Sequence, residues 1–243
     1  MSDQSSERNS YMAPVGAGNL LGFIVRFDFK PGWQEERKKQ GLVDFIDTMI
    51  QEPTFVNFFR LEDRANPNRV VLYETWNCSK EYFLEVEMKR PYRETYERIL
   101  PSLVRTPRKM ELDWRLVRSD SHPLDPSSDD EKVGFFVHFQ IQPGKEEEFR
   151  GLLDPLLDTM SKEARFINYY LLQHEQESGR FVIYETWLGT VEDFLKVEMP
   201  RPYRQEYEKA VPGMLARPRE IERDWKLVYA ADRGGRFRSA NSQ

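Results

Sequence analysis

GFIVRFDFKPG (residues 22–32) recurs as GFFVHFQIQPG (residues 134–144), and this repetition decides the fold. Both stretches alternate aromatic or aliphatic residues with other side chains and then end in Pro-Gly. Further matches follow in the same order along the chain: YETW at 73–76 and 184–187, FLEVEMKRPYR at 83–93 and FLKVEMPRPYR at 194–204, and DW at 113–114 and 224–225. A repeat this long indicates duplication of a whole domain, because solenoid repeats have periods of about 20–50 residues.

The chain of 243 residues therefore divides into two modules. We expect module one at residues 20–117 and module two at residues 132–228. Residues 118–131 between them are rich in Ser, Asp and Pro, which is typical of a linker. Residues 1–19 and 229–243 are polar and rich in small residues, so they are expected to be a disordered N-terminus and a flexible C-terminal tail.

Each module is expected to fold as β-α-β-β-α-β. Alternating apolar residues predict the strands, and Ser79 and Thr190 are typical helix N-caps. This order predicts an α+β, ferredoxin-like module whose helices cover one face of a four-stranded sheet. The other face is also apolar, so we expect the two sheets to pack on each other in a covalently tied pseudo-dimer, with a cleft beneath the helices of each module. The first helix of module one should carry Leu42, Phe45, Ile46 and Met49 on its apolar face.

The composition argues against several classes of function. The net charge is −5 and Lys and Arg are scattered, so neither a nucleic acid nor an anionic membrane is an expected partner. Cys78 is the single cysteine, which excludes an intrachain disulfide. The chain begins without the pattern of a signal peptide, and no apolar run approaches the ~18 residues that span a bilayer. We expect a soluble, cytoplasmic protein.

The usual cofactor motifs are missing from the sequence. GAG at residues 16–18 precedes the first expected strand, whereas a dinucleotide-binding loop follows one. His122, His138 and His174 are far apart in sequence and none recurs in the other module, so no metal site is expected.

The combination of Pro-Gly after the first strand, YETW on the third and Pro-Tyr-Arg in the following helix resembles the antibiotic biosynthesis monooxygenase (ABM) family. The resemblance covers roughly residues 20–117 and 132–228. It implies a dimeric α+β barrel, here formed within one chain. Family members include cofactor-independent oxygenases of anthrones and quinols, isomerases, and proteins without known substrates. Tandem members of about this length include oxygenases that open a ring of angucycline polyketides with reduced flavin.

This chain matches the family at some of its functional positions and has a different residue at others. Trp76 and Trp187 match the tryptophan that lines the family's substrate pocket, and Tyr82 matches a pocket tyrosine. Other positions depart from the family pattern. Asp193 replaces that tyrosine in module two, Leu72 and Ile183 replace an asparagine, and Glu87 and Glu198 replace a histidine. These departures argue against the simplest anthrone-oxygenase mechanism.

An oxygenase without a bound metal needs a substrate that supplies the electrons, and an ionised phenol, quinol or anthrone can do so. The protein then provides a water-poor aromatic pocket, donors that stabilise the enolate, and a base. His138 is the candidate base, because an imidazole titrates near neutral pH. The remaining catalytic candidates are Trp187, Asn168 and Arg204, and the substrate-binding candidates are Trp76, Tyr82, Asn57, Arg93, Tyr203 and Glu198.

Each candidate also has a structural interpretation. The tryptophans could fill the core, and the asparagines could cap a loop. Arg93 and Arg204 precede Glu97 and Glu208 by four residues, as in surface helix pairs. His138 could be a hydrogen-bonded structural histidine. Glu87 and Glu198 could be solvated helix residues, and the Asp-Trp pairs could anchor an arginine across the sheet. Cys78 could have no functional role.

The leading hypothesis is a monooxygenase that acts with dioxygen on a polycyclic aromatic or quinol-type molecule. It has no tightly bound cofactor, and reduced flavin (FADH2 or FMNH2) from a separate flavin reductase is the co-substrate that the ring-opening relatives suggest. The alternatives are a non-catalytic protein that binds an aromatic ligand, and an isomerase or cyclase that uses no oxygen. Module two, which carries His138 and His174, is favoured as the active half. The chain could act as a monomeric pseudo-dimer or as a homodimer.

Overall fold

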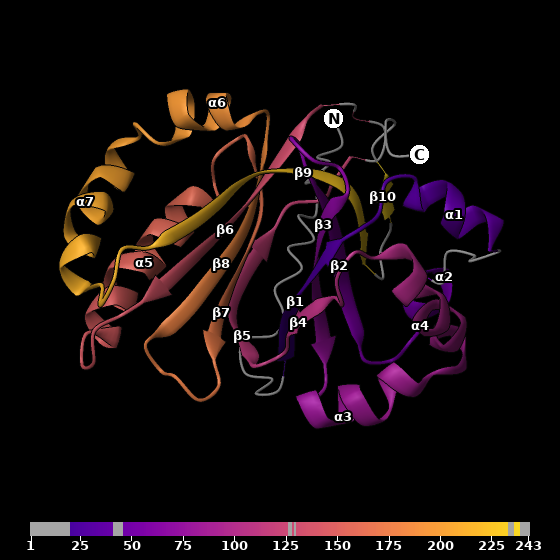
Figure 1. The fold of residues 1–243 in the computed structure, drawn as a ribbon. Helices are drawn as coiled ribbons and strands as arrows, with labels where there is room; N and C mark the ends of the chain where they lie inside the picture. Colours follow the sequence, from indigo (N-terminus) through magenta and orange to yellow (C-terminus); the bar gives the residue numbers. More distant parts are fainter. Residues whose placement is uncertain (1–19, 41–45, 126–127, 129, 233–235, 239–243) are drawn as a thin grey trace, which may run out of the picture.

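The computed structural model describes residues 20–40, 46–125, 128, 130–232 and 236–238 (Figure 1). The expected disordered N-terminus lies outside these residues, as do Leu42 and Phe45 of the first helix and most of the tail after residue 232. No helix in the described part of the chain is both long enough and apolar enough to cross a membrane.

Both modules have the expected β-α-β-β-α-β order, and the last strand of module one is split into two pieces. Module one contains β1 (Leu20–Asp28), α1 (Trp33–Lys39), α2 (Ile46–Met49), β2 (Phe55–Asp63), β3 (Arg69–Asn77), α3 (Lys80–Glu85), η1 (Glu87–Lys89), α4 (Pro91–Leu103), β4 (Lys109–Glu111) and β5 (Trp114–Ser121). Module two contains β6 (Lys132–Gln140), α5 (Glu146–Met160), β7 (Phe166–His174), β8 (Arg180–Leu188), α6 (Val191–Asp193), η2 (Phe194–Glu198), α7 (Pro202–Ala210), η3 (Val211–Met214), β9 (Glu220–Asp232) and β10 (Arg236–Arg238).

The helices begin where the sequence predicts. The side chain of Ser79 accepts a hydrogen bond from the backbone N–H of Tyr82, and Thr190 forms a capping box with Asp193. Pro91 and Pro202 open α4 and α7. A proline is favoured there, because the first helical N–H has no partner within the helix.

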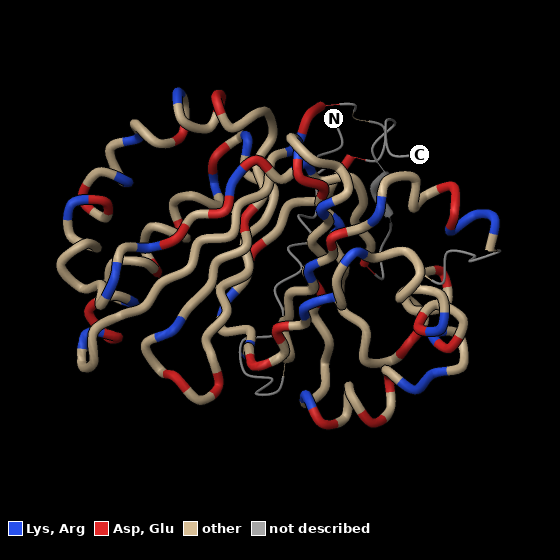
Figure 2. Tube along the Cα trace, in the orientation of Figure 1, with Lys and Arg blue, Asp and Glu red and all other residues tan. Residues whose placement is uncertain are grey.

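The described strands close into an eight-stranded antiparallel barrel. The order around the ring is β9-β2-β3-β1-β5-β7-β8-β6, and pairing between β6 and β9 completes it. Figure 1 shows the helices of module one covering one side of this barrel and those of module two covering the opposite side. The expected intramolecular α+β barrel is therefore confirmed. Along the tube in Figure 2, acidic and basic residues interleave on both halves.

The last strand of each module crosses into the other half. β5 pairs with β7 from Trp114↔His174 to Ser121↔Asn168. The first part of β9 pairs with β6, and its second part pairs with β2 as far as Asn57↔Asp232. Each module therefore supplies an outer strand to the sheet of its partner.

This exchange moves two of the expected boundaries. Arg118–Ser121 lies in β5 and not in a linker, and Tyr229–Asp232 lies in β9 and not in a flexible tail. Tyr229, Ala230 and Ala231 are buried. Their polar or small-residue composition suggested loops, because the sequence alone does not show that the other module supplies their hydrogen-bonding partners.

The third strand of each module sends alternate side chains to different cores, as the pleat of a strand requires. In β3, Tyr73 points into the barrel, whereas Trp76 belongs to the core beneath the helices of module one. Tyr184 and Trp187 of β8 repeat this arrangement in module two. The strand is apolar on both faces because both faces are covered.

An aromatic cluster from both modules fills the middle of the barrel. Phe59 and Tyr73 come from module one, and Tyr170 and Tyr184 occupy the corresponding places in module two. The ring centroids of Tyr73 and Tyr170 are 4.7 Å apart, and those of Phe59 and Tyr184 are 5.5 Å apart. Each ring therefore packs against rings of the other module, at separations typical of favourable aromatic pairs.

The Asp-Trp pairs hold the modules together at the edges of this cluster. Trp114 of module one lies beneath the guanidinium of Arg180, whose carbon is 5.1 Å from the ring centroid. Arg69 lies over Trp225 in the same way at 5.7 Å. Both contacts join one module to the other, which agrees with the structural interpretation of these pairs.

Two glycines set how closely the modules approach. A Cβ atom added to Gly22 would lie 2.5 Å from Cδ2 of Leu172, and one added to Gly134 would lie 2.2 Å from Cδ2 of Leu61. Each leucine belongs to the opposite module and is fully buried. The first strand of each module therefore needs glycine here so that the partner's leucine can pack against its backbone.

We expect Gly134→Ala to lower the free energy of unfolding by about 1–3 kcal/mol, the usual cost of forcing an extra carbon into a packed core. Urea unfolding measures this loss. Gly151→Ala is the control, because a Cβ at Gly151 meets nothing within 4 Å and this residue lies on the exposed side of α5. In a double-mutant cycle, Leu61→Ala should reduce the cost of Gly134→Ala; strict additivity would contradict this close contact.

Candidate functional site

A cavity lies beneath the helices of each module in the described chain. The cavity of module one has a volume of about 280 Å³, and that of module two about 100 Å³. Separate clefts under the two sets of helices are what the sequence predicts. The larger cavity, however, belongs to module one, so the preference for module two as the active half does not agree with the space available.

Aromatic rings form most of one end of the larger cavity. Phe29 stacks between Phe27, at 5.1 Å between centroids, and Trp33, at 4.1 Å. Phe58 meets Tyr229 edge to face at 6.0 Å. Such a wall excludes water and fits a flat aromatic ligand.

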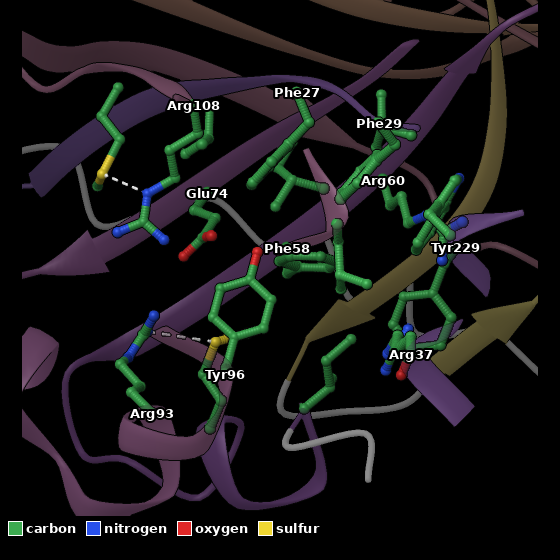
Figure 3. A pocket seen from close by; sticks show the side chains of 18 of the residues that line it. Phe27, Phe29, Arg37, Phe58, Arg60, Glu74, Arg93, Tyr96, Arg108 and Tyr229 are labelled. Carbon is green, nitrogen blue, oxygen red and sulfur yellow. Dashed lines mark hydrogen bonds between the residues drawn. The ribbon is translucent and has the colours of Figure 1, made fainter. Parts of the chain in front are cut away.

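Four polar side chains lie at the other end of the same cavity. Figure 3 shows Glu74 from β3 between Arg108 and Arg93, with the hydroxyl of Tyr96 directed toward it. Arg93 and Tyr96 come from α4, and Arg108 lies just before β4. The site therefore combines an acid, a phenol and two cations at the edge of an apolar space.

Glu74 is a buried carboxyl with an altered pKa. Burial raises the pKa of Glu74 above its ordinary value of 4.5, and the charges of Arg93 and Arg108 and the N–H of Trp76 counteract part of this rise. Burial also raises the pKa of Tyr96 to about 12, so this phenol keeps its proton at neutral pH. A carboxyl whose pKa is moved toward neutrality can exchange protons with a bound phenol.

Arg93 and Arg204 are not the surface helix residues that their spacing from Glu97 and Glu208 allowed. Each is 5% exposed. The glutamates pair with other arginines: Glu97 accepts from Arg108 at 2.7 Å, and Glu208 accepts from Arg219 at 3.0 Å. Arg93, a binding candidate, and Arg204, a catalytic candidate, are buried, and both border cavities.

Trp76 and Trp187 are fully buried and lie behind the cavities instead of lining them. The indole N–H of Trp76 donates to Glu74 at 2.8 Å. Arg93 and Arg204 lie over these rings, at 5.6 Å and 5.3 Å from the centroids. In module one, the tryptophan therefore positions the acid and the cation of the site.

Asn57 and Asn168 point into the barrel and not toward the cavities. A β-bulge separates Phe55 from Asn57, and a second one separates Phe166 from Asn168. Each bulge inserts one residue and reverses the face that follows, so the asparagines do not share the face of Phe55 and Phe166, as strict alternation along the strand would require. The amide of Asn57 donates to the hydroxyl of Tyr170 at 3.1 Å.

His138 lies at one end of the barrel. Its Nε2 is 2.7 Å from Oε1 of Glu222, which also receives two hydrogen bonds of 2.7 Å from Arg26. Burial raises the pKa of Glu222, but the hydrogen bonds and charges of His138 and Arg26 outweigh that effect and lower it. His138 borders neither cavity, so the structural interpretation fits this residue and the predicted role as base does not.

The remaining predicted binding residues are spread around the sites. Tyr82 is 42% exposed, and Tyr203 packs beside Arg204 without bordering the smaller cavity. Glu198 is buried next to Arg201, with 3.6 Å between Oε2 and Nε. Its counterpart Glu87 accepts from Thr54 at 2.7 Å. These two glutamates are therefore buried in η1 and η2, just before α4 and α7, and are not solvated helix residues.

No group of three or more His, Cys, Asp or Glu side chains is placed to hold a metal ion within the described ranges. Cys78 is buried, and burial raises the pKa of its thiol to about 11, with a smaller contribution from Glu87. A thiol with a raised pKa is a poor nucleophile at neutral pH.

Three residues of the polar end, Glu74, Tyr96 and Arg108, were missed from the sequence. The signal for Glu74 was present, because it stands two residues before Trp76 and so shares its buried face. No sequence pattern indicated Arg108 as a site residue. It lies between α4 and β4, and the course of the chain there places it at the cavity.

The volume of the larger cavity, about 280 Å³, lies just below the range of about 300–1,000 Å³ that is usual for small-molecule pockets.

Comparison with known families finds a match in both modules. The family described as "Antibiotic biosynthesis monooxygenase" matches residues 21–81 and 133–188, one segment in each module. Comparison with curated proteins finds no match.

Solved structures share the whole architecture. A protein from Fusobacterium nucleatum subsp. nucleatum, provisionally assigned as a monooxygenase, has a TM-score of 0.71 at 14% identity, covering 90% of this chain and 96% of its own. A provisionally assigned monooxygenase from Lactobacillus acidophilus has a TM-score of 0.63 at 12% identity, covering 91% and 97%. An "anthrone oxidase-like protein" has 0.58 at 11%, covering 89% and 94%. At such identities the likeness shows the fold.

The stability of the Glu74→Gln variant relative to wild type should increase as the pH rises. Because the folded-state pKa is raised, ionisation favours the unfolded chain, so wild-type stability falls as pH rises from about 4.5 through the folded-state pKa. The gap between the two proteins should widen by about 1.4 kcal/mol for each unit of pKa elevation. Urea unfolding from pH 4.5 to 8 measures it.

The exposed Glu94 of α4 provides the control, since Glu94→Gln also removes one carboxylate. A gap between wild type and Glu74→Gln that stays constant or narrows with rising pH would show that Glu74 is not held in a desolvated site.

Proposed function

We propose that this chain, which carries two antibiotic biosynthesis monooxygenase domains, is an oxygenase that acts with dioxygen on a phenolic or quinol-type polycyclic aromatic molecule bound in module one. The family match and the shared architecture support monooxygenase-type activity. The substrate class rests on the chemistry of the larger cavity. The single observation that carries it is Glu74, a buried carboxyl with a raised pKa at the edge of an aromatic space.

The ionised form of Glu74 removes a proton from the bound substrate and produces a phenolate or enolate. Arg93 and Arg108 stand on either side of Glu74 and stabilise this anion in surroundings of low polarity. Tyr96 keeps its proton and supplies a hydrogen bond to a substrate oxygen. The aromatic wall excludes water, which would otherwise compete for the reactive carbon.

The substrate supplies the electrons for the reaction. Its anion transfers one electron to dioxygen, and recombination of the radical pair forms a carbon–oxygen bond and a peroxide anion. This anion takes back the proton held by Glu74 and becomes a hydroperoxide. Loss of water from the hydroperoxide breaks the O–O bond and leaves a ketone. One CH2 group and one O2 thus give one C=O group and one water molecule, with no external reductant.

Oxygen uptake with 1,8-dihydroxyanthrone distinguishes this reaction from the alternatives. Uptake without flavin supports the proposal as stated. Uptake only with FMNH2 or FADH2 and a flavin reductase would favour a reduced-flavin co-substrate, and conversion under strict anaerobiosis would favour an isomerase or cyclase. Tight binding of an unchanged ligand would favour a binding protein.

Glu74→Gln should lower kcat/KM at least about a hundredfold, because a glutamine cannot accept the substrate proton and general bases contribute about 10²–10⁴ in rate. The matched control is Glu185→Gln, the same change at the equivalent position of module two. Its kcat/KM should stay within about twofold of wild type. Equal losses in the two variants would contradict the assignment of the reaction to module one.

A further inference from the structure

The exchanged strands place a residue of one module against the helix-covered core of the other. Tyr229 of β9 belongs to module two by sequence, yet it lines the cavity of module one. Arg118 occupies the corresponding position on β5, which belongs to module one and pairs with β7. The two modules therefore differ in a wall residue that each receives from its partner.

In module two, the donated arginine ties the first long helix to the sheet. Nε of Arg118 donates to the hydroxyl of Tyr169 at 2.9 Å, and its Nη2 binds the carboxylate of Asp158 on α5. Nη1 lies 3.5 Å from Oδ1 of Asp154, one turn earlier on the same helix. These contacts hold α5 against β7 at the place where module one has an aromatic wall.

Phe149 closes the same region of module two from the helix side. It is fully buried and packs on Phe139 at 5.1 Å and on Phe181 at 5.4 Å. The space that remains borders Glu185 and Arg204, the counterparts of the polar end of module one. Module two therefore keeps the polar end of the cavity, and its aromatic end is reduced, with Phe139 still bordering the space that remains.

In module one, the equivalent positions leave the aromatic end open. Phe58 stands in place of Tyr169 and meets Tyr229 edge to face, with no hydrogen bond between the two rings. Arg37 of α1 borders the cavity near the same end (Figure 3). The cavity of module one measures about 280 Å³, and that of module two about 100 Å³.

We propose that Tyr229, donated by module two, is a specificity-determining residue of the module-one site, and that Arg118 and Phe149 occlude the equivalent site of module two. The chain then binds one aromatic ligand. This inference rests on the proposed function for the location of the site, but it concerns binding and requires no turnover. Module two retains the fold in order to close the barrel and to supply one wall of its partner's cavity.

The test is the number of ligand molecules bound per chain. The probe is 1,8-dihydroxyanthraquinone, a three-ring phenol that lacks the oxidisable carbon of an anthrone, titrated by calorimetry into the full-length protein. Wild type should bind one molecule. Exchanging the module-two pair into module one, as Phe58→Tyr with Tyr229→Arg, should weaken binding at least tenfold. Asp47 already stands at the position of Asp158, so the new arginine has an acidic neighbour.

The reciprocal variant, Arg118→Tyr with Tyr169→Phe and Phe149→Ala, should bind a second molecule while the first site keeps its affinity. Far-UV circular dichroism checks that each variant is folded. If a variant does not fold, the number of probe molecules bound by wild type still tests the inference. The inference would be overturned if wild type bound no probe or bound two molecules at equal sites. It would also be overturned if Phe58→Tyr with Tyr229→Arg bound the probe with wild-type affinity, or if the reciprocal variant had a single site. Binding of one probe without oxygen uptake from the anthrone would instead sink the proposed function alone.

Discussion

The structure depends on the close approach of the two sheets inside one barrel. Leu61 of module one packs on Gly134, and Leu172 of module two packs on Gly22, at distances where no Cβ would fit. This reciprocal contact brings the inner faces together and lets the crossing strands β5 and β9 pair with the opposite module. Neither sheet could bury its inner face alone, so the duplication within one chain guarantees a partner for each sheet.

The same closure explains how charged groups come to be buried beneath the helices. Once the barrel covers the inner faces, Glu74 and Trp76 on the outer face of β3 are sealed under α4, together with Arg93. The acid, the cation and the indole satisfy one another there, whereas an isolated buried charge would strongly destabilise the fold. A site with an altered pKa is therefore a by-product of packing that a substrate can use.

The two halves illustrate how equal folds can carry unequal sites. Most core positions match between modules, but module one receives Tyr229 where module two receives Arg118, and Phe149 is fully buried in module two. The first difference replaces a ring by an ion-pairing arginine, and Phe149 adds a ring to the core of module two. These changes alter the cavity without altering the strand order, because they lie at the edge of the helix-covered cores.

The sequence by itself determined the duplication, the βαββαβ order, the helix caps and the need for a covered second face, because repeats, periodicity and capping are local properties of the chain. Which residues meet was decided only by the tertiary structure. A β-bulge turned Asn57 into the barrel, His138 lies within hydrogen-bond distance of Glu222, and Glu97 pairs with Arg108 while Arg93 points inward. Such outcomes depend on the register and on contacts between distant segments, which no local pattern encodes.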